Sequence, residues 1–187
     1  MSLIRMVWFS VEQHNALLRH AAADAPREAC GVLLGSITSG VAQVNQVIPV
    51  ANIADDPHVS YRLDDTHLAR IVGGLARTGG EIVGFYHSHP ASAPIPSSSD
   101  VRLAAYADVP YVIVGQRAGG AVSAAWRIAD GAVEPIDSIV ADVAPLPPPE
   151  LGMSFQYTLL VLAAVTVCVM VIAAAILLLP PAPVIPR

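Results

Sequence analysis

Short apolar runs separated by polar turns dominate the first 140 residues of the chain. Runs of this kind, rich in β-branched and aromatic residues, are typical of β-strands. The predicted strands cover 4–9, 29–37, 41–50, 81–87, 111–115, 122–128 and 133–136, with a further short strand around Tyr61. Turn signals such as Asp130 followed by Gly131 separate several of them, so neighbouring strands are expected to be joined by tight turns.

Three segments between these strands predict α-helices. Ser10, with Gln13 three residues later, has the capping-box arrangement that begins a helix, and Gly79 with Gly80 ends another. The predicted helices cover 11–23, from 64 or 65 to about 77, and from about 97 to 107. The resulting fold class is α/β of the α+β type, with a curved, mixed β-sheet flanked by helices.

A long apolar segment without charged residues lies near the C-terminus. Its 23 residues, 157–179, would form a helix of roughly 34 Å, enough to cross a hydrocarbon core of about 30 Å. A buried core helix is the alternative, and it would need a larger domain around it. The predicted organisation is a domain over 1–140, a proline-rich linker over 141–156, a transmembrane helix over 157–179 and a tail over 180–187.

The ends of the chain give an expectation about location. The apolar run 3–9 is shorter than the core of a signal peptide and lacks a small-residue cleavage site. We therefore expect a single-pass C-terminal anchor with the first domain in the cytoplasm. Arg187, beyond the span, is the one residue that favours the opposite orientation under the positive-inside rule.

Charge and cysteine content narrow the functional class. Only 13% of residues are charged, the formal net charge is -5, and no cluster of arginines is present, so nucleic acid binding is not expected. Cys30 and Cys168 lie in different regions and are poor candidates for a disulfide. Cys30, within an apolar strand, is interpreted as a packed core thiol and not a nucleophile.

The segment after residue 86 carries the residues most typical of a metal site. His87 and His89 are two apart at the end of a strand, so both imidazoles point to the same face. Asp100 falls in the first turn of the next helix. Two imidazoles and one carboxylate, with a fourth position left for water, form the ligand set of a catalytic zinc site. Alternatively, each histidine is solvated and Asp100 only completes a capping box with Ser97, but the combination favours zinc.

Zinc-assisted hydrolysis also needs a group that accepts and returns a proton. The upstream candidates are Glu12, Asp24 and Glu28. Glu12 is explained by the first turn of a helix, where a carboxylate complements the helix dipole. Glu28 opens an apolar strand, where a carboxylate is costly unless it has a partner. Glu28 is therefore the predicted general base.

These residues together resemble the motif of the JAMM, or MPN+, zinc metallopeptidases. That motif is a Glu, then His, Ser or Thr, His and Pro, six further residues, Ser, two residues and Asp. The matching positions are Glu28, His87, Ser88, His89, Pro90, Ser97 and Asp100, and the resemblance extends over about 7–136. The short proline-rich stretch 91–98 is more similar to the bacterial branch that includes hydrolases of sulfur-carrier protein–cysteine conjugates.

The resemblance implies one catalytic zinc held by His87, His89 and Asp100, with Glu28 as acid and base. It implies that Ser97 helps to stabilise the oxyanion and that Ser88 is structural. It also implies hydrolysis of an amide or isopeptide bond, often after the C-terminal Gly-Gly of a ubiquitin-like or sulfur-carrier protein. A non-catalytic MPN scaffold that presents a protein-binding surface at the membrane is the alternative hypothesis, although such scaffolds typically lack motif residues.

Overall fold

The computed structural model describes residues 3–143 and 153–177. The chain divides into two compact units, 1–148 and 149–187. The core of the predicted linker, 144–149, and the predicted tail, 180–187, lie outside the described residues.

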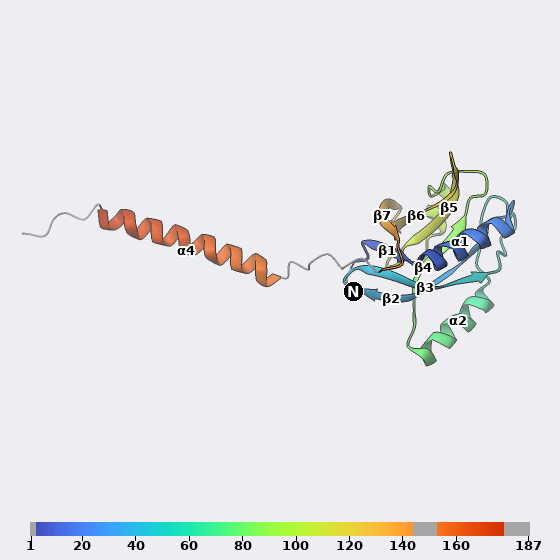
Figure 1. The fold of residues 1–187 in the computed structure, drawn as a ribbon, viewed down its shortest axis with the longest axis horizontal. Helices are drawn as coiled ribbons and strands as arrows, with labels where there is room; N and C mark the ends of the chain where they lie inside the picture. Colours follow the sequence, from blue (N-terminus) through green and yellow to red (C-terminus); the bar gives the residue numbers. More distant parts are fainter. Residues whose placement is uncertain (1–2, 144–152, 178–187) are drawn as a thin grey trace, which may run out of the picture. The chain divides into compact units, whose positions relative to one another are not determined.

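One mixed β-sheet forms the body of the first unit (Figure 1). Its strands, in chain order, are β1 (Met6–Phe9), β2 (Cys30–Thr38), β3 (Val41–Val50), β4 (Glu81–Ser88), β5 (Tyr111–Arg117), β6 (Gly120–Ala129) and β7 (Ala132–Val140). The spatial order is β1-β3-β2-β4-β5-β6-β7, and the sheet closes on itself into a barrel. The prediction of a curved, mixed sheet is confirmed, and closure is the feature that the sequence did not indicate.

Strand β1 closes the sheet because it pairs with a strand on each side. It runs parallel to β3, with Met6 opposite Val41, and parallel to β7, with Met6 opposite Asp137. The β2–β3 and β6–β7 pairs are antiparallel hairpins, as the turn signals predicted. Strands β4 and β5 run parallel, so their carboxyl ends lie at the same edge of the sheet.

Three helices lie within residues 3–143, the described part of the first unit. They are α1 (Val11–Asp24), α2 (Asp65–Thr78) and the short α3 (Ser98–Leu103). Ser10 accepts a hydrogen bond from the backbone N–H of Gln13, and Asp64 accepts from two N–H groups at the start of α2, so both predicted caps are present. Helices α1 and α2 lie on either side of the β2–β3 pair in Figure 1.

Two predictions about local structure are wrong. The helix predicted to reach Ala107 ends at Leu103, because the backbone of Ala104 is extended and the N–H of Tyr106 donates to the Tyr111 hydroxyl at 2.9 Å. Tyr61 is not part of a strand. Its segment is irregular and has one isolated bridge, between Asn52 and Leu63.

The alternation of side chains along the strands produces two apolar clusters. The first, around Phe9, Leu33 and Tyr86, includes Leu17 of α1. The second, around Val32, Phe85 and Tyr111, packs against Leu68 and Ile71 of α2. His87 is two residues from Phe85 in β4, so its side chain points to the face that α2 covers.

The second unit contains α4 (Met153–Leu177). Within the described part of the chain, no helix combines the length and the apolar character that crossing a membrane requires. The predicted span, 157–179, overlaps α4, and its last two residues lie outside the described residues. The transmembrane assignment therefore stays a prediction.

Candidate metal centre

His87 occupies the most enclosed position of the site. It lies in β4 between Cys30 of β2 and Ile113 of β5, which are its partners in the two neighbouring strands. Its side chain is completely buried. Apolar β-strands on both sides hold the imidazole in place, and a buried imidazole needs a polar or metal partner to offset its lost hydration.

His89 follows directly after β4, where the chain leaves the sheet. Its backbone N–H still donates to the carbonyl of Val114 in β5, at 2.7 Å. Its Nδ1 lies 3.2 Å from the carbonyl oxygen of Ala93. Because a carbonyl can only accept, Nδ1 carries the proton, and Nε2 of the neutral ring is left with a free lone pair. This is the tautomer that binding a metal through Nε2 requires.

The loop between His89 and α3 is held by the neighbouring strands. The N–H of Gln116 donates to the carbonyl of Ser92 at 2.7 Å, and the indole N–H of Trp126 donates to the carbonyl of Pro94 at 2.9 Å. Gly115 allows the loop to lie directly against β5, because a Cβ there would be 2.6 Å from the Ser92 oxygen. The loop therefore reaches α3 along a defined path.

Asp100 enters the site from the first turn of α3. Its backbone N–H donates to Ser97 Oγ at 3.2 Å, and its Oδ2 accepts from the backbone N–H of Ser97 at 2.6 Å. The capping box considered as an alternative from the sequence is thus present. It does not compete with the metal-site interpretation, since the same carboxylate also faces both histidines.

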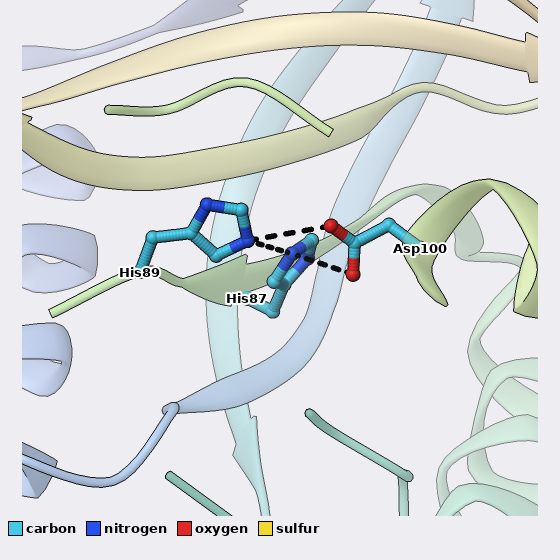
Figure 2. A group of neighbouring side chains, drawn as sticks. All are labelled: His87, His89 and Asp100. Atoms are coloured by element: carbon cyan, nitrogen blue, oxygen red, sulfur yellow. Dashed lines mark hydrogen bonds and ion pairs between the residues drawn. The ribbon is translucent and has the colours of Figure 1, made fainter. Parts of the chain in front are cut away.

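The three predicted ligands converge on one point (Figure 2). Nε2 of His87 is 3.3 Å from Asp100 Oδ1, Nε2 of His89 is 3.3 Å from Asp100 Oδ2, and the two Nε2 atoms are 3.0 Å apart. One possible ligand atom from each residue falls within a mutual distance of 4.8 Å. Bonds of about 2.0–2.2 Å in a tetrahedral arrangement place two ligand atoms roughly 3.3–3.6 Å apart, close to the distances found here, so the three residues fit Zn²⁺.

The charges of the three residues support one another. Burial lowers the pKa of His87 despite the adjacent carboxylate. Burial is the largest single influence on His89 and opposes its protonation. The hydrogen bonds with Asp100 and with the Ala93 carbonyl, together with the charges of Asp100 and Glu28, outweigh burial and raise the pKa of that imidazole. Burial opposes ionisation of Asp100, whereas its hydrogen bonds with His87 and His89 hold its pKa far below the usual range. A neutral His87 and an ionised Asp100 are the forms that bind a cation.

Glu28 lies beside this group and is not one of its three members. Its side chain is buried, and its Oε2 has no hydrogen-bond partner among the described residues. Burial raises the pKa of Glu28 to about 7, with the charge of His89 opposing the shift and that of Asp100 adding to it. A carboxyl group with a pKa near neutrality exchanges protons readily at physiological pH.

The two serines of the motif have different surroundings. Ser97 Oγ accepts from the N–H of Asp100 and lies 2.9 Å from Ser99 Oγ. Its hydroxyl proton can therefore be directed to Ser99 or to another acceptor. Ser88 Oγ accepts from the N–H of Ala29 at 2.8 Å, so it joins the end of β4 to the residue after Glu28.

The other upstream candidates lie elsewhere. Glu12 is exposed in the first turn of α1. Asp24 forms ion pairs with His20 and Arg27, each at 3.7 Å.

Cys30 is completely buried, and burial raises the pKa of its thiol to about 12, so it remains protonated at neutral pH. The thiol therefore lacks the thiolate character of a nucleophile.

Tyr61 is a site residue that the sequence did not indicate. Its ring stacks on the imidazole of His87, with centroids 4.2 Å apart and planes inclined by 19°. It also begins a groove of about 250 Å³ that adjoins a second hollow of about 480 Å³. The groove and the hollow share four lining residues, which are Leu68, Phe85, Ala105 and Tyr106. The mainly apolar groove thus leads away from the metal site between α2 and the segment after α3.

Comparisons with known proteins cover most of the first unit. The family described as prokaryotic homologs of the JAB domain matches residues 10–129. The chain is 38% identical to a desampylase of Haloferax volcanii over 56% of its own length and 76% of that protein. It is 37% identical to a CysO-cysteine peptidase of Mycobacterium tuberculosis over 67% of its own length and 86% of that protein.

A solved structure has the same fold. The solution structure of a protein from Desulfitobacterium hafniense superimposes with a TM-score of 0.67 at 27% sequence identity. The superposition covers 74% of this chain and 94% of that protein. The matched share agrees with the extent of the first unit.

Proposed function

Because the chain belongs to the JAMM/MPN+ family, as a prokaryotic homologue of the JAB domain, and is a JAMM-type hydrolase, we propose that it is a zinc-dependent isopeptidase. Its proposed substrate is an amide bond after the C-terminal Gly-Gly of a ubiquitin-like or sulfur-carrier protein. The observation that carries the proposal is the convergence of His87, His89 and Asp100 on one point, beside the buried carboxyl group of Glu28.

In the proposed site, His87, His89 and Asp100 hold one zinc ion per chain. A bound zinc ion supplies a water of lowered pKa and a positive charge that polarises the scissile carbonyl. Glu28 accepts a proton at its carboxylate and returns it to the leaving amine, for which a pKa of about 7 is well suited. Ser97 directs its hydroxyl proton to the carbonyl oxygen as negative charge develops there.

The apolar groove supports the assignment of a polypeptide substrate. It begins at Tyr61 next to His87 and continues past Phe85 and Tyr106, so an extended peptide could lie along it. A carrier protein's C-terminal residues would occupy the groove, and the following Gly-Gly would pass the metal site. The desampylase and the CysO-cysteine peptidase support this class of substrate by their names.

The central test measures metal content and cleavage in the same preparation. Two probes are used: a ubiquitin-fold carrier ending in Gly-Gly joined to cysteine, and the same carrier joined to a lysine side chain. We expect one zinc per chain and cleavage of at least one probe. A folded chain that binds no zinc, or one that binds zinc and cleaves neither probe, would contradict the proposal.

Two variants separate the role of Glu28 from a general effect on folding. We expect Glu28→Gln to retain zinc and to lower kcat about 10²- to 10⁴-fold, since it removes general acid–base catalysis. The matched control is Glu12→Gln, which makes the same change at an exposed position of α1 and should leave kcat unchanged.

We propose in addition that α4 anchors the chain in a membrane, with the hydrolase unit on the cytoplasmic side. Support comes from the charge-free sequence of 157–179 and from exposed apolar side chains such as Leu162 and Met170. An exposed apolar surface of this kind requires a nonaqueous environment or a partner. The proposal predicts that the full chain stays in the membrane fraction after alkaline washing.

Charged substitutions test this anchor. Leu162→Arg together with Met170→Arg should move the chain to the soluble fraction, because an arginine in the centre of a bilayer is costly. Val133→Arg, on the surface of the first unit, is the control and should not change the fractionation. Wild-type chain in the soluble fraction would contradict the anchor and leave the proposed hydrolysis unaffected.

A further inference from the structure

The segment between β3 and α2 covers the metal site without forming regular structure. It carries Tyr61, whose ring stacks on His87, and Pro57, whose carbonyl accepts a hydrogen bond from the N–H of Glu28 at 2.7 Å. The segment thus touches both the predicted base and a predicted ligand. Its conformation needs an explanation, because its backbone groups have few partners in strands or helices.

Two backbone hydrogen bonds close the segment, from the N–H of Ile53 to the carbonyl of Arg62 at 2.8 Å and from the N–H of Asp64 to the carbonyl of Ala51 at 3.2 Å, and the side chain of Asn52 adds four more. Its Nδ2 donates to the carbonyl of Glu28 at 2.9 Å and to the carbonyl of Ser60 at 3.0 Å. Its Oδ1 accepts from the N–H of Ala54 and from the N–H of Arg62, each at 3.0 Å. A primary amide has two donor hydrogens and two acceptor lone pairs, so the hydrogen-bonding capacity of Asn52 is fully used.

These four bonds join the two sides of the site. Ser60 and Arg62 flank Tyr61 directly, so Asn52 holds the backbone on both sides of the residue that stacks on His87. The bond to the Glu28 carbonyl holds the residue whose carboxyl group interacts with His89 and Asp100. One side chain therefore connects the position of the base with the position of the aromatic ring.

We propose that Asn52 is the positioning residue of the active site, which aligns Glu28 with the metal ligands and holds Tyr61 against His87. The proposal rests on the proposed hydrolytic function for its kinetic consequence only. Asn52 does not touch the reacting atoms. It acts by restricting Glu28 and Tyr61 to one arrangement, as hydrogen bonds to the residues around a metal site commonly do.

The chemistry of the position is specific to an amide. Aspartate has the same shape but no donors, so it would lose the bonds to the carbonyls of Glu28 and Ser60 and place a negative charge beside both oxygens. Serine is shorter and keeps only one donor. Both variants should loosen Tyr61 and Glu28 while leaving the metal ligands unchanged.

The first experiment uses a readout that does not depend on activity. In the metal-free protein, the ring protons of His87 should carry an upfield NMR shift from the stacked ring of Tyr61. We expect Asn52→Asp to reduce this shift, and Tyr61→Leu to abolish it. The matched control is Asn45→Asp, the same change at an exposed position of β3, where the amide oxygen accepts one bond from Gln43. It should leave the His87 shift intact.

The second experiment separates positioning from simple destabilisation. With the carrier–cysteine probe, we expect Asn52→Asp to lower kcat about 10- to 100-fold, in line with losses at metal-supporting hydrogen bonds, while KM changes less than about threefold. If Asn52 acts through Tyr61, the losses of Asn52→Asp and Tyr61→Leu should not multiply in the double variant.

The outcomes distinguish the proposals. A folded Asn52→Asp with wild-type kcat and an unchanged His87 shift would overturn the role of Asn52. If the wild type cleaves no probe, the proposed function fails, and the NMR comparison still decides whether Asn52 positions Tyr61. If Asn52→Asp does not fold, Asn52→Ser is used in the same measurements, with a change in the same direction expected.

Discussion

Ser97 and Asp100 cap each other at the start of α3. The backbone N–H of Ser97 donates to Asp100 Oδ2 at 2.6 Å, and the backbone N–H of Asp100 donates to Ser97 Oγ at 3.2 Å. One oxygen of Asp100 thus contributes both to the helix start and to the contact with His89. The cap orients the carboxylate before any metal binds, which reduces the entropy lost on binding.

Ser97→Ala should lower both stability and zinc affinity. Loss of a serine N-cap costs about 1 kcal/mol of unfolding free energy, and Asp100 loses its orienting partner. Chemical denaturation measures the first effect, and competition with a zinc chelator measures the second. Ser97→Thr should preserve both, and Ser98→Ala, at the next and exposed position, is the control. Unchanged zinc affinity in Ser97→Ala would refute the orienting role of the cap.

Gly115→Ala should destabilise the first unit because the added Cβ would meet the backbone of Pro94 and Ser92. Overpacking of this kind typically costs about 1–3 kcal/mol, and here it would also displace the loop that holds His89. The measurements are thermal unfolding and zinc affinity. Gly73→Ala is the opposite case, since no atom lies within 4 Å of its Cβ position and the residue is helical. It should raise stability slightly.

The stability of the metal-free protein should depend on pH through Glu28. Burial raises the pKa of its carboxyl group from 4.5 to about 7. Between these values the folded state binds more protons than the unfolded state, so stability falls as pH rises through this window. Glu28→Gln removes this dependence. The free energy of unfolding of this variant, relative to that of the wild type, should increase by up to about 3 kcal/mol between pH 4 and pH 8.

Denaturant titrations at several pH values, with a chelator present, test this expectation. Glu12→Gln, the same change at an exposed position of α1, is the matched control. The same stability difference between wild type and Glu28→Gln at both ends of the range would show that the Glu28 carboxyl group titrates normally.

Cys30 should not take part in the reaction. Its buried thiol has a pKa of about 12 and donates to the carbonyl of Val50 at 3.4 Å. We expect Cys30→Ala to cleave the carrier probe with a kcat within about threefold of wild type, and the native thiol to resist alkylation at pH 8. Complete loss of activity in a folded, zinc-loaded Cys30→Ala would contradict a purely structural role.

The local elements of the fold could be predicted because they depend on nearby residues. Strand β3 begins at Val41 and ends at Val50 as expected from its apolar run, and Ser10 caps α1 as expected from its spacing to Gln13. The same holds for the metal cluster. His87 near the end of β4 and His89 directly after it are two residues apart, and this spacing at the end of a strand predicts that their side chains share a face.

The sequence by itself therefore determined most of the strands and helices, and it predicted which residues are the candidate ligands and the base. Only the tertiary structure decided how the sheet closes, because β1 pairs with two strands far from it in sequence. It also decided the end of α3, because the N–H of Tyr106 donates to the Tyr111 hydroxyl and not to a carbonyl of the helix. Asn52 and Tyr61 join the site for the same reason. The Asn52–Glu28 hydrogen bond and the Tyr61–His87 stacking join segments that are distant in sequence, and such contacts leave no periodic or spacing signal in the chain.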